Sequence, residues 1–369
     1  MEITIRAIGL ANPDLSLDQE RALKLANHLS DARANDVLRE RIAAKTGILK
    51  RHSVLLEPDK TGRPKQDFFN PPTSSGDQGP STADRMQAYE SRAYALVEQA
   101  VTQCLLKEGT DAYQGLEHVV SCSCTGFSSP GIDIRLIREL SLPTTITRTH
   151  VGFMGCHGLL NALRVSAALG HAQPTKILCF AVELCSLHYQ YSETPDQMVA
   201  NTLFADGAAA LLLESVPNAN AEEERWQLVA QKSNLFEGTD EEITWKIGDH
   251  GFVMHLSREV AIHLETHLKS YVDSALESCG YSRSDVRHWA IHPGGPRILD
   301  AVASALALDD EDLAMSRSVL KNYGNMSSPT IAFILATIFE ETTSGPVVAL
   351  AFGPGITCEL AIFQRGSSG

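Results

Sequence analysis

Three features of the sequence predict a mixed α/β fold with two related halves that share one core. Two apolar runs, 176–183 and 347–351, have the length and uninterrupted apolar character of strands covered on both faces. In each half a glycine and a polar residue, Gly155-Cys156 and Gly324-Asn325, precede a buried helix. A glycine turn also joins late strands in each half. This repetition indicates a duplicated α/β unit.

A polar segment around residues 216–225 marks the expected boundary between the halves. We therefore expect an N-terminal half at residues 1–220 and a C-terminal half at residues 221–369. A chain of 369 residues is long enough for two domains or for one large layered one.

The elements of the first half follow from local signals. Residues 2–10 suggest a strand and residues 17–45 a helical region. Residues 57–81 are rich in Asp, Lys, Gly, Pro and Ser, which predicts a long loop. Ser81 is a good N-cap for a helix that continues to about residue 108. A buried strand that ends in small residues is expected at 116–126.

A glycine turn with a cysteine at its apex follows at residues 152–158. The next residues are mostly apolar up to Gly170, which predicts a buried helix with a glycine stop. Cys156 then lies at the start of this helix, where the dipole and free N–H groups favour a thiolate.

The second half is expected to begin after a buried strand at 206–213. Residues 251–271 predict a turn and a long amphipathic helix. This helix carries His263, Glu265 and His267, but Leu264 stands where a zinc-protease helix needs Glu, so we expect a solvated face. The remaining elements are expected to be strands at 289–291, 347–351 and 356–363 and a helix at 330–339.

Composition limits the function and the cellular location. The net charge of −14 argues against nucleic acid or an anionic membrane as partner. Eight cysteines without regular spacing indicate a reducing compartment. The first residues lack the pattern of a signal peptide, and no apolar run approaches the ~20 residues of a membrane span. We therefore expect a cytoplasmic protein.

Three polar residues lie on separate glycine-rich turns beside buried elements: Cys156, His292 and Asn325. Because each turn follows or precedes a buried element, the three side chains can be aimed rigidly at one point. Each also has a structural explanation, as a small buried side chain, a strand cap or a turn residue. A papain-like protease uses the same three residue types, but its cysteine signature is absent. Cys122 and Cys124 lack a second ligand pair at zinc spacing, so we expect no metal site there.

The motifs around these residues resemble those of type III polyketide synthases, the chalcone and stilbene synthase family of the thiolase superfamily. They occur in family order and cover nearly the whole chain from about residue 38. The His and Asn motifs and the C-terminal loop differ from those of ketoacyl synthase III enzymes. The motifs are Gly155-Cys156, 203–209, 292–296, 323–328 and 352–355.

The resemblance implies a five-layered αβαβα fold, a homodimer, and catalysis by Cys156, His292 and Asn325. Cys156, as a thiolate paired with His292, would accept an acyl-CoA starter. His292 and Asn325 would bind the enolate oxygen formed when malonyl-CoA loses CO₂. Repeated condensation and ring closure would give a pyrone, a resorcinol or a phloroglucinol. No metal or redox cofactor is needed, and both CoA and an acyl carrier protein stay open as starter donors.

The resemblance also implies binding residues. Arg41 and Lys45 match two of three basic positions that bind CoA phosphates, while Leu38 takes the third and Arg39 is considered as its substitute. Phe204 and Met254 occupy two gatekeeper positions between the CoA tunnel and the cavity. The other expected cavity residues are Cys124, Cys185, His188, Trp245, Ser327 and Gly355.

Several cavity positions depart from the plant enzymes. Cys124, Cys185 and His188 replace threonines, and Trp245 stands near a glycine position, which would shorten or redirect the cavity. Ser129 takes the position from which the partner subunit supplies a methionine. These departures fit a microbial enzyme better than plant flavonoid chemistry.

Two other functions stay open. One is a related condensing enzyme, similar to ketoacyl synthase III, that makes a single condensation or joins two β-ketoacyl chains. The other is a non-catalytic relative that binds acyl-CoA. Product analysis with malonyl-CoA as the only extender distinguishes the single-condensation or chain-joining enzyme from a polyketide synthase. Acyl labelling of Cys156 distinguishes the non-catalytic relative from an enzyme.

Overall fold

The computed structural model describes residues 1–30, 35–74, 76–109, 112–217, 225–342 and 344–366. Among these residues, nine strands form one sheet in the order β13-β14-β15-β10-β1-β9-β8-β6-β7. In that order the strands are His288–Ile291, Val347–Gly353, Thr357–Arg365, Trp226–Leu235, Glu2–Ala11, Asp206–Val216, Thr175–Leu184, Leu116–Ser123 and Thr147–Gly152.

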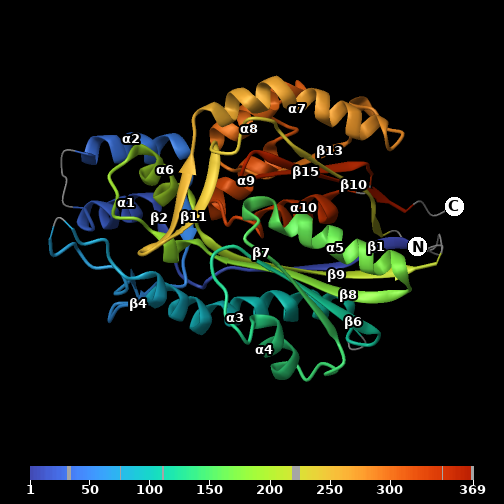
Figure 1. Cartoon of the computed structure of the whole chain (residues 1–369), viewed down its shortest axis with the longest axis horizontal. Helices are drawn as coiled ribbons and strands as arrows, with labels where there is room; N and C mark the ends of the chain where they lie inside the picture. Colours follow the sequence, from blue (N-terminus) through green and yellow to red (C-terminus); the bar gives the residue numbers. More distant parts are fainter. Residues whose placement is uncertain (31–34, 75, 110–111, 218–224, 343, 367–369) are drawn as a thin grey trace.

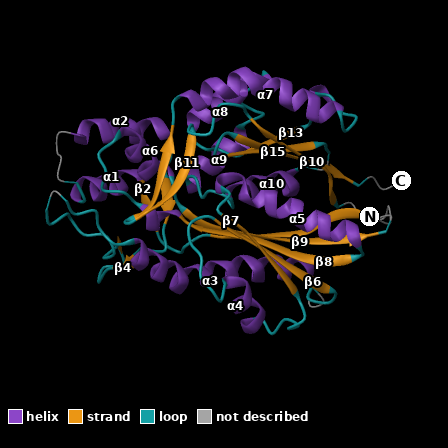
Figure 2. Ribbon diagram, viewed as in Figure 1, coloured by secondary structure: helices purple, strands orange, loops and turns teal. Residues whose placement is uncertain are grey.

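The helices pack on this sheet in layers, which Figure 1 and Figure 2 show edge-on. Helices α3 and α4 cover one outer face, α7 and α8 cover the other, and α5 and α10 lie in the middle. The expected five-layered arrangement is therefore confirmed. The helices are α1 Gln19–His28, α2 Asp36–Thr46, α3 Thr82–Glu108, α4 Ile132–Glu139, α5 Gly158–Ala172, α6 Pro195–Leu203, α7 Glu259–Glu277, α8 Pro296–Leu306, α9 Ala314–Tyr323 and α10 Thr330–Glu341.

Strand β8 shows why the sequence folds into layers. Alternate side chains of a strand point to opposite faces of the sheet. Ile177, Cys179 and Ala181 enter the core shared with α5 and α10. Leu178 and Phe180 enter the core beneath α3. A strand buried on both faces is expected to be mainly apolar, as residues 177–182 are between Lys176 and Glu183.

The two halves share one continuous sheet, joined at β1 and β10, and the core around α5 and α10. Strand β1 pairs antiparallel with β9 on one side and with β10 on the other. The expected boundary between residues 220 and 221 lies outside the described residues. The division into two halves stays a prediction.

Local signals predicted some element ends correctly and others wrongly. Ser81 caps α3 in a capping box with Asp84, as expected. Gly170 does not end its helix, because α5 continues to Ala172. A Cβ at Gly170 would lie 2.6 Å from Ile3 Cδ1, so this glycine permits close packing of the helix on the sheet.

The turn expected at the start of 251–271 is instead half of a β-hairpin. Strand β11, Ile243–Gly248, pairs with β12, Gly251–Leu256, and α7 begins only at Glu259. The other paired segments are short: β2 Ser16–Asp18 with β3 Lys50–His52, and β4 Glu57–Pro58 with β5 Pro64–Lys65. No helix in the described ranges combines the length and the apolar character that a membrane crossing requires.

Candidate active site

Cys156 lies in the short 3₁₀ turn Gly155–His157 that leads directly into α5. The chain reverses there through Phe153 and Gly155, which have φ values of 59° and 74°. A Cβ at Gly155 would lie 2.8 Å from Pro354 Cδ, so glycine is required by backbone conformation and by space. The turn directs the Cys156 side chain into a cavity that reaches across both halves.

His292 lies in the same cavity, one residue beyond the end of β13. Its backbone N–H donates to Leu350 O at 2.8 Å, and the residue is 1 % exposed. Neither ring nitrogen has a hydrogen-bond partner among the described residues. Burial lowers the pKa of His292 to about 3, and the nearby His157 adds to this effect. The imidazole is therefore neutral and can accept a proton or donate one.

Asn325 reaches the cavity from the turn between α9 and α10. Its backbone N–H donates to Leu203 O at 2.9 Å. Its side-chain Oδ1 accepts the backbone N–H of Ser327 at 2.7 Å, and its Nδ2 lies 3.4 Å from Gly294 O. These bonds fix the amide, with its N–H groups on the side away from Ser327 N.

The sulfur of Cys156 lies beside the side chains of Ser327 and Asn325. Burial raises the pKa of the Cys156 thiol to about 11, while hydrogen bonds from these two side chains act in the opposite direction. Burial opposes both the thiolate of Cys156 and the charged form of His292. The expected pairing of a thiolate with a charged His292 stays a prediction.

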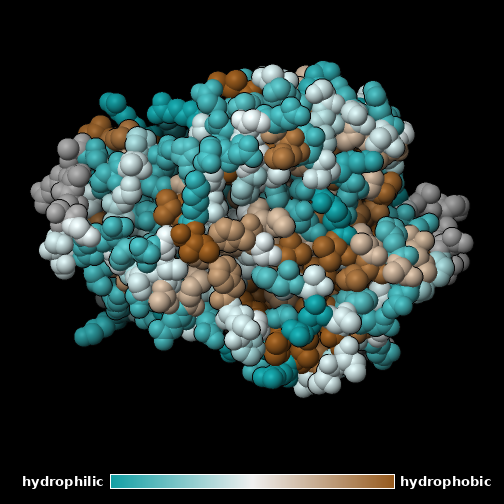
Figure 3. All heavy atoms as spheres, in the orientation of Figure 1, coloured by the Kyte–Doolittle hydropathy of each residue, from teal (hydrophilic) through white to brown (hydrophobic). Residues whose placement is uncertain are grey.

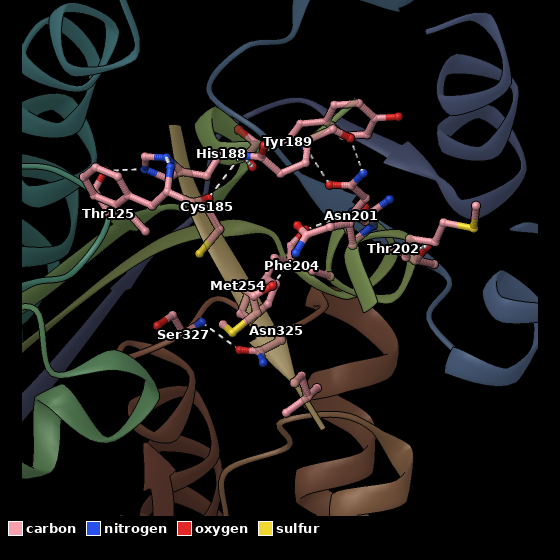
Figure 4. Close-up of a pocket in the computed structure, with 18 of the residues that line it drawn as sticks. Thr125, Cys185, His188, Tyr189, Asn201, Thr202, Phe204, Met254, Asn325 and Ser327 are labelled. Carbon is pink, nitrogen blue, oxygen red and sulfur yellow. Dashed lines mark hydrogen bonds between the residues drawn. The ribbon is translucent and has the colours of Figure 1, made fainter. Parts of the chain in front are cut away.

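Seven of the other expected residues line the cavity together with these three, and Figure 4 shows most of them. Phe204 and Met254 lie close to the bonded pair Ser327 and Asn325. The seven are Phe204, Met254, Cys124, Cys185, His188, Trp245 and Ser327.

Three expected binding residues do not line the cavity. Gly355 lies outside the lining, where its N–H donates to Ile243 O at 2.9 Å in the turn before β15. Arg41 and Lys45 lie on the exposed face of α2. Arg39 cannot substitute as a free cation, because it is 6 % exposed and contacts Asp36 and Glu193 at 2.6 Å.

His188 forms a wall of the cavity with aromatic neighbours. Its Nε2–H donates to Thr125 O at 2.7 Å, and its Nδ1 accepts the backbone N–H of Phe252 at 3.0 Å. The imidazole stacks on Phe252 at 4.2 Å, and Trp245 donates to Cys124 O at 2.7 Å. Because both ring nitrogens are occupied, His188 shapes the cavity and is unsuited to proton transfer.

Sequence reasoning missed Phe252 and Glu183. Phe252 escaped because residues 251–256 were not expected to pair as a strand. Glu183 is fully buried, and its carboxylate accepts Cys124 N–H at 3.0 Å and Thr125 Oγ1–H at 2.7 Å. A single glutamate at the end of the apolar run 176–183 was the available signal.

Comparisons with known proteins agree with this geometry. Residues 2–217 match the family described as "Chalcone and stilbene synthases, N-terminal domain", and residues 227–365 match the corresponding C-terminal domain. "Alpha-pyrone synthesis polyketide synthase-like Pks18" of Mycobacterium tuberculosis is 33% identical over 252 residues. That match covers 67% of this chain and 64% of the relative, so it spans less than two thirds of that protein. The "Putative chalcone synthase" of Bacillus subtilis is 29% identical over 375 residues, 98% of each chain.

Solved structures share the fold along the whole chain. PKS-I from the brown alga Ectocarpus siliculosus superimposes with a TM-score of 0.91 at 26% identity, covering 99% of this chain and 98% of the other. 1,3,6,8-Tetrahydroxynaphthalene synthase from Streptomyces coelicolor gives a TM-score of 0.83 at 25% identity and 99% coverage of both chains.

Proposed function

This chain belongs to the chalcone and stilbene synthase family of type III polyketide synthases, and we propose that it loads an acyl starter on Cys156 and extends it with malonyl-CoA. The observation that carries the proposal is the convergence of Cys156, His292 and Asn325. They come from three separate segments and line one cavity. All three rest on elements of the core, so their relative positions are held rigidly.

In the loading step the neutral thiol of Cys156 attacks the carbonyl carbon of the starter thioester. The thiol proton passes to the neutral imidazole of His292, and the bond from carbon to CoA sulfur breaks. The proton then passes to the departing CoA thiolate, which leaves an acyl group on Cys156. Ser327 and Asn325 donate to the sulfur and favour the transient thiolate.

In the extension step malonyl-CoA loses CO₂, and the electron pair of the broken carbon–carbon bond forms an enolate. An N–H of His292 and the Nδ2–H of Asn325 donate to the enolate oxygen. The enolate carbon attacks the Cys156 thioester carbon, and the bond from that carbon to sulfur breaks. Cys156 leaves as a thiolate that takes up a proton from solvent, and the extended chain, now a CoA thioester, is loaded on Cys156 again before the next extension. Removing one such donor typically costs about 100- to 1000-fold in rate.

Repetition of this step gives a poly-β-ketone that closes to a pyrone, a resorcinol or a phloroglucinol. Trp245 limits the room for this chain because its indole is held by Cys124 O and packs against His188. The starter donor is CoA or an acyl carrier protein, and Arg41 and Lys45 are the proposed contacts for CoA phosphates at the surface.

Mass spectrometry of intact protein and products tests the function. Native protein and Cys156→Ala are incubated with malonyl-CoA and a panel of acyl-CoA starters, and then with acyl carrier proteins. We expect an acyl adduct on native protein only, with products that grow by decarboxylated malonyl units. An adduct without extension would point to a single-condensation enzyme, and no adduct from any donor would refute catalysis.

We also propose that the protein works as a homodimer. Figure 3 shows apolar surface over β11, β7 and α5. Phe127, Phe153 and Met154 are 47%, 36% and 42% exposed, and the two phenyl rings lie 6.4 Å apart. A second copy would cover this surface and would approach the turn that carries Cys156. Sedimentation should give a dimer for native protein and for Ile262→Asp on the exposed face of α7, and a monomer for Phe153→Asp.

A further inference from the structure

Arg51 of β3 lies where the end of α6 meets the turn between α9 and α10. Its Nη1 group donates to Asn201 O at 2.7 Å and to Phe204 O at 2.9 Å. On its other side, Arg51 Cγ lies 2.9 Å from the position that a Cβ of Gly324 would take. Arg51 therefore touches two segments at once, the one that carries the proposed gate residue Phe204 and the one that carries Asn325.

These two segments are also joined to each other through their backbones. Phe204 and Asn325 form an isolated parallel bridge, and Figure 4 shows the two residues side by side. Asn325 N–H donates to Leu203 O at 2.9 Å, and Ala205 N–H donates to Asn325 O at 2.9 Å. Both backbone polar groups of Asn325 are thus bound to residues 203–205. The place of its side-chain amide in the cavity therefore depends on where that segment is held.

A guanidinium is suited to this corner because it meets the C-terminal end of a helix. Helix α6 ends at Leu203, and the last carbonyl groups of a helix carry partial negative charge. Burial lowers the pKa of Arg51 to about 10, and the nearby Tyr189 and Asp206 act in the opposite direction. Arg51 therefore keeps its proton at neutral pH, and both of its hydrogen bonds to α6 are charge-assisted.

The strand that carries Arg51 is itself anchored. Arg51 lies opposite Leu17 in the pairing of β3 with β2. Just before β3, Leu49 N–H donates to Lys321 O in the last turn of α9 at 2.7 Å. Strand β3 is thus fixed to α9, and through Arg51 it holds the end of α6. The turn with Asn325 lies between these two attachments.

We infer that Arg51 is a positioning residue that holds residues 203–205 against the α9–α10 turn, so that the Asn325 amide meets the enolate oxygen formed from malonyl-CoA. This inference rests on the proposed function. Removing such a donor typically costs about 100- to 1000-fold in rate. A displacement on the order of 1 Å costs about 100-fold. Loss of Arg51 should therefore slow decarboxylation, but less than loss of the Asn325 amide does.

The test measures kcat for decarboxylation of malonyl-CoA without a starter. The enolate then takes up a proton from solvent, and the acetyl-CoA formed is counted by mass spectrometry. Arg51→Met should lower kcat by about 10- to 100-fold, and Asn325→Ala by about 100- to 1000-fold. Adding Arg51→Met to Asn325→Ala should lower kcat by less than about threefold more, because no amide is left to position.

Two further variants separate positioning from a general loss of stability. Arg283→Met also removes an arginine from a helix end, since Arg283 Nη1 donates to Leu306 O at the end of α8, outside the cavity lining. Melting temperatures compare its stability with that of Arg51→Met, and its kcat should equal that of native enzyme. Arg51→Lys keeps the charge and a donor, so it should recover part of the loss. It also serves in the same comparison with Asn325→Ala if Arg51→Met does not fold.

The outcomes distinguish the inference from the proposed function. Losses for Arg51→Met and Asn325→Ala that multiply in the double variant would overturn the inference alone, because Arg51 would then not act through Asn325. The same loss of kcat in Arg283→Met would also overturn it alone. A native enzyme that forms no acetyl-CoA from malonyl-CoA would overturn the proposed function and the inference with it.

Discussion

The reactivity of Cys156 toward an alkylating reagent measures how strongly burial holds the proton on its sulfur. Only the thiolate reacts, so the rate follows the ionised fraction. With a pKa of about 11, about one thiol in a thousand is ionised at pH 8. We therefore expect the alkylation rate to rise tenfold for each pH unit between pH 7 and pH 10, without a plateau.

Ser327 provides the perturbation, since its side chain hydrogen-bonds to the Cys156 sulfur and lowers the pKa. A hydrogen bond to a charged group contributes about 1.5–3 kcal/mol, which corresponds to roughly one to two pKa units. Ser327→Ala should therefore slow alkylation at pH 8 by roughly 10- to 100-fold. The slope against pH should stay unchanged.

The assay follows iodoacetamide labelling of peptides by mass spectrometry. Cys279 is the other cysteine that is not fully buried, so it serves as an internal reference, and Cys279→Ser gives a clean background. Cys156→Ala should remove the signal assigned to the cavity. A plateau below pH 9, or faster labelling of Ser327→Ala, would refute the argument that burial controls this thiol.

Three further predictions concern the turn, the cavity and pH. Gly155→Ala should destabilise the protein by about 1–2 kcal/mol because of backbone strain, and the clash of the new methyl group with Pro354 should add to this loss. Gly238→Ala is the control, because Gly238 has a similar φ of 73° but no atom near the position of a Cβ, so it should lose only the strain energy. Urea unfolding measures the free energy of unfolding of both variants, and equal losses would argue against the clash with Pro354. Trp245→Ala should enlarge the cavity and lengthen the products by at least one malonyl unit in liquid chromatography–mass spectrometry; an unchanged product profile would show that another wall sets the length. Burial raises the pKa of Asp206 from 3.8 to about 6, so its protonated form favours the native state, and stability should fall by up to about 3 kcal/mol as pH rises from 3.8 to 6. Asp206→Asn should lack this decline in urea unfolding, and an identical pH profile would contradict the assignment.

Sequence reasoning succeeded where neighbouring residues determine the structure. The capping box at Ser81 depends on residues three positions apart, and the turn before α5 depends on the left-handed conformation that glycine permits. Residues 177–182 are apolar because both faces of this strand are buried. These features predicted several of the strands and helices and the mixed α/β class, whereas the five layers were implied by the resemblance. The motifs on the glycine turns indicated the family.

Tertiary contacts decided what the sequence left open or predicted wrongly. The β11–β12 hairpin was missed although its two strands are neighbours in the chain, whereas the stacking of Phe252 on His188 joins distant segments and could not be read from the sequence. Arg39 and Arg41 look equivalent in the sequence, but only one faces the buried side of α2. Gly170 permits close packing because Ile3 crosses it.

Cys156 combines a property that the local sequence determines with one that only the tertiary structure determines. Its place at the start of a helix follows from the glycine pattern, which is local. The pKa of its thiol depends on burial beneath elements from both halves of the chain. Desolvation is a property of the whole fold, so only the tertiary structure decided that the pKa of this thiol is raised.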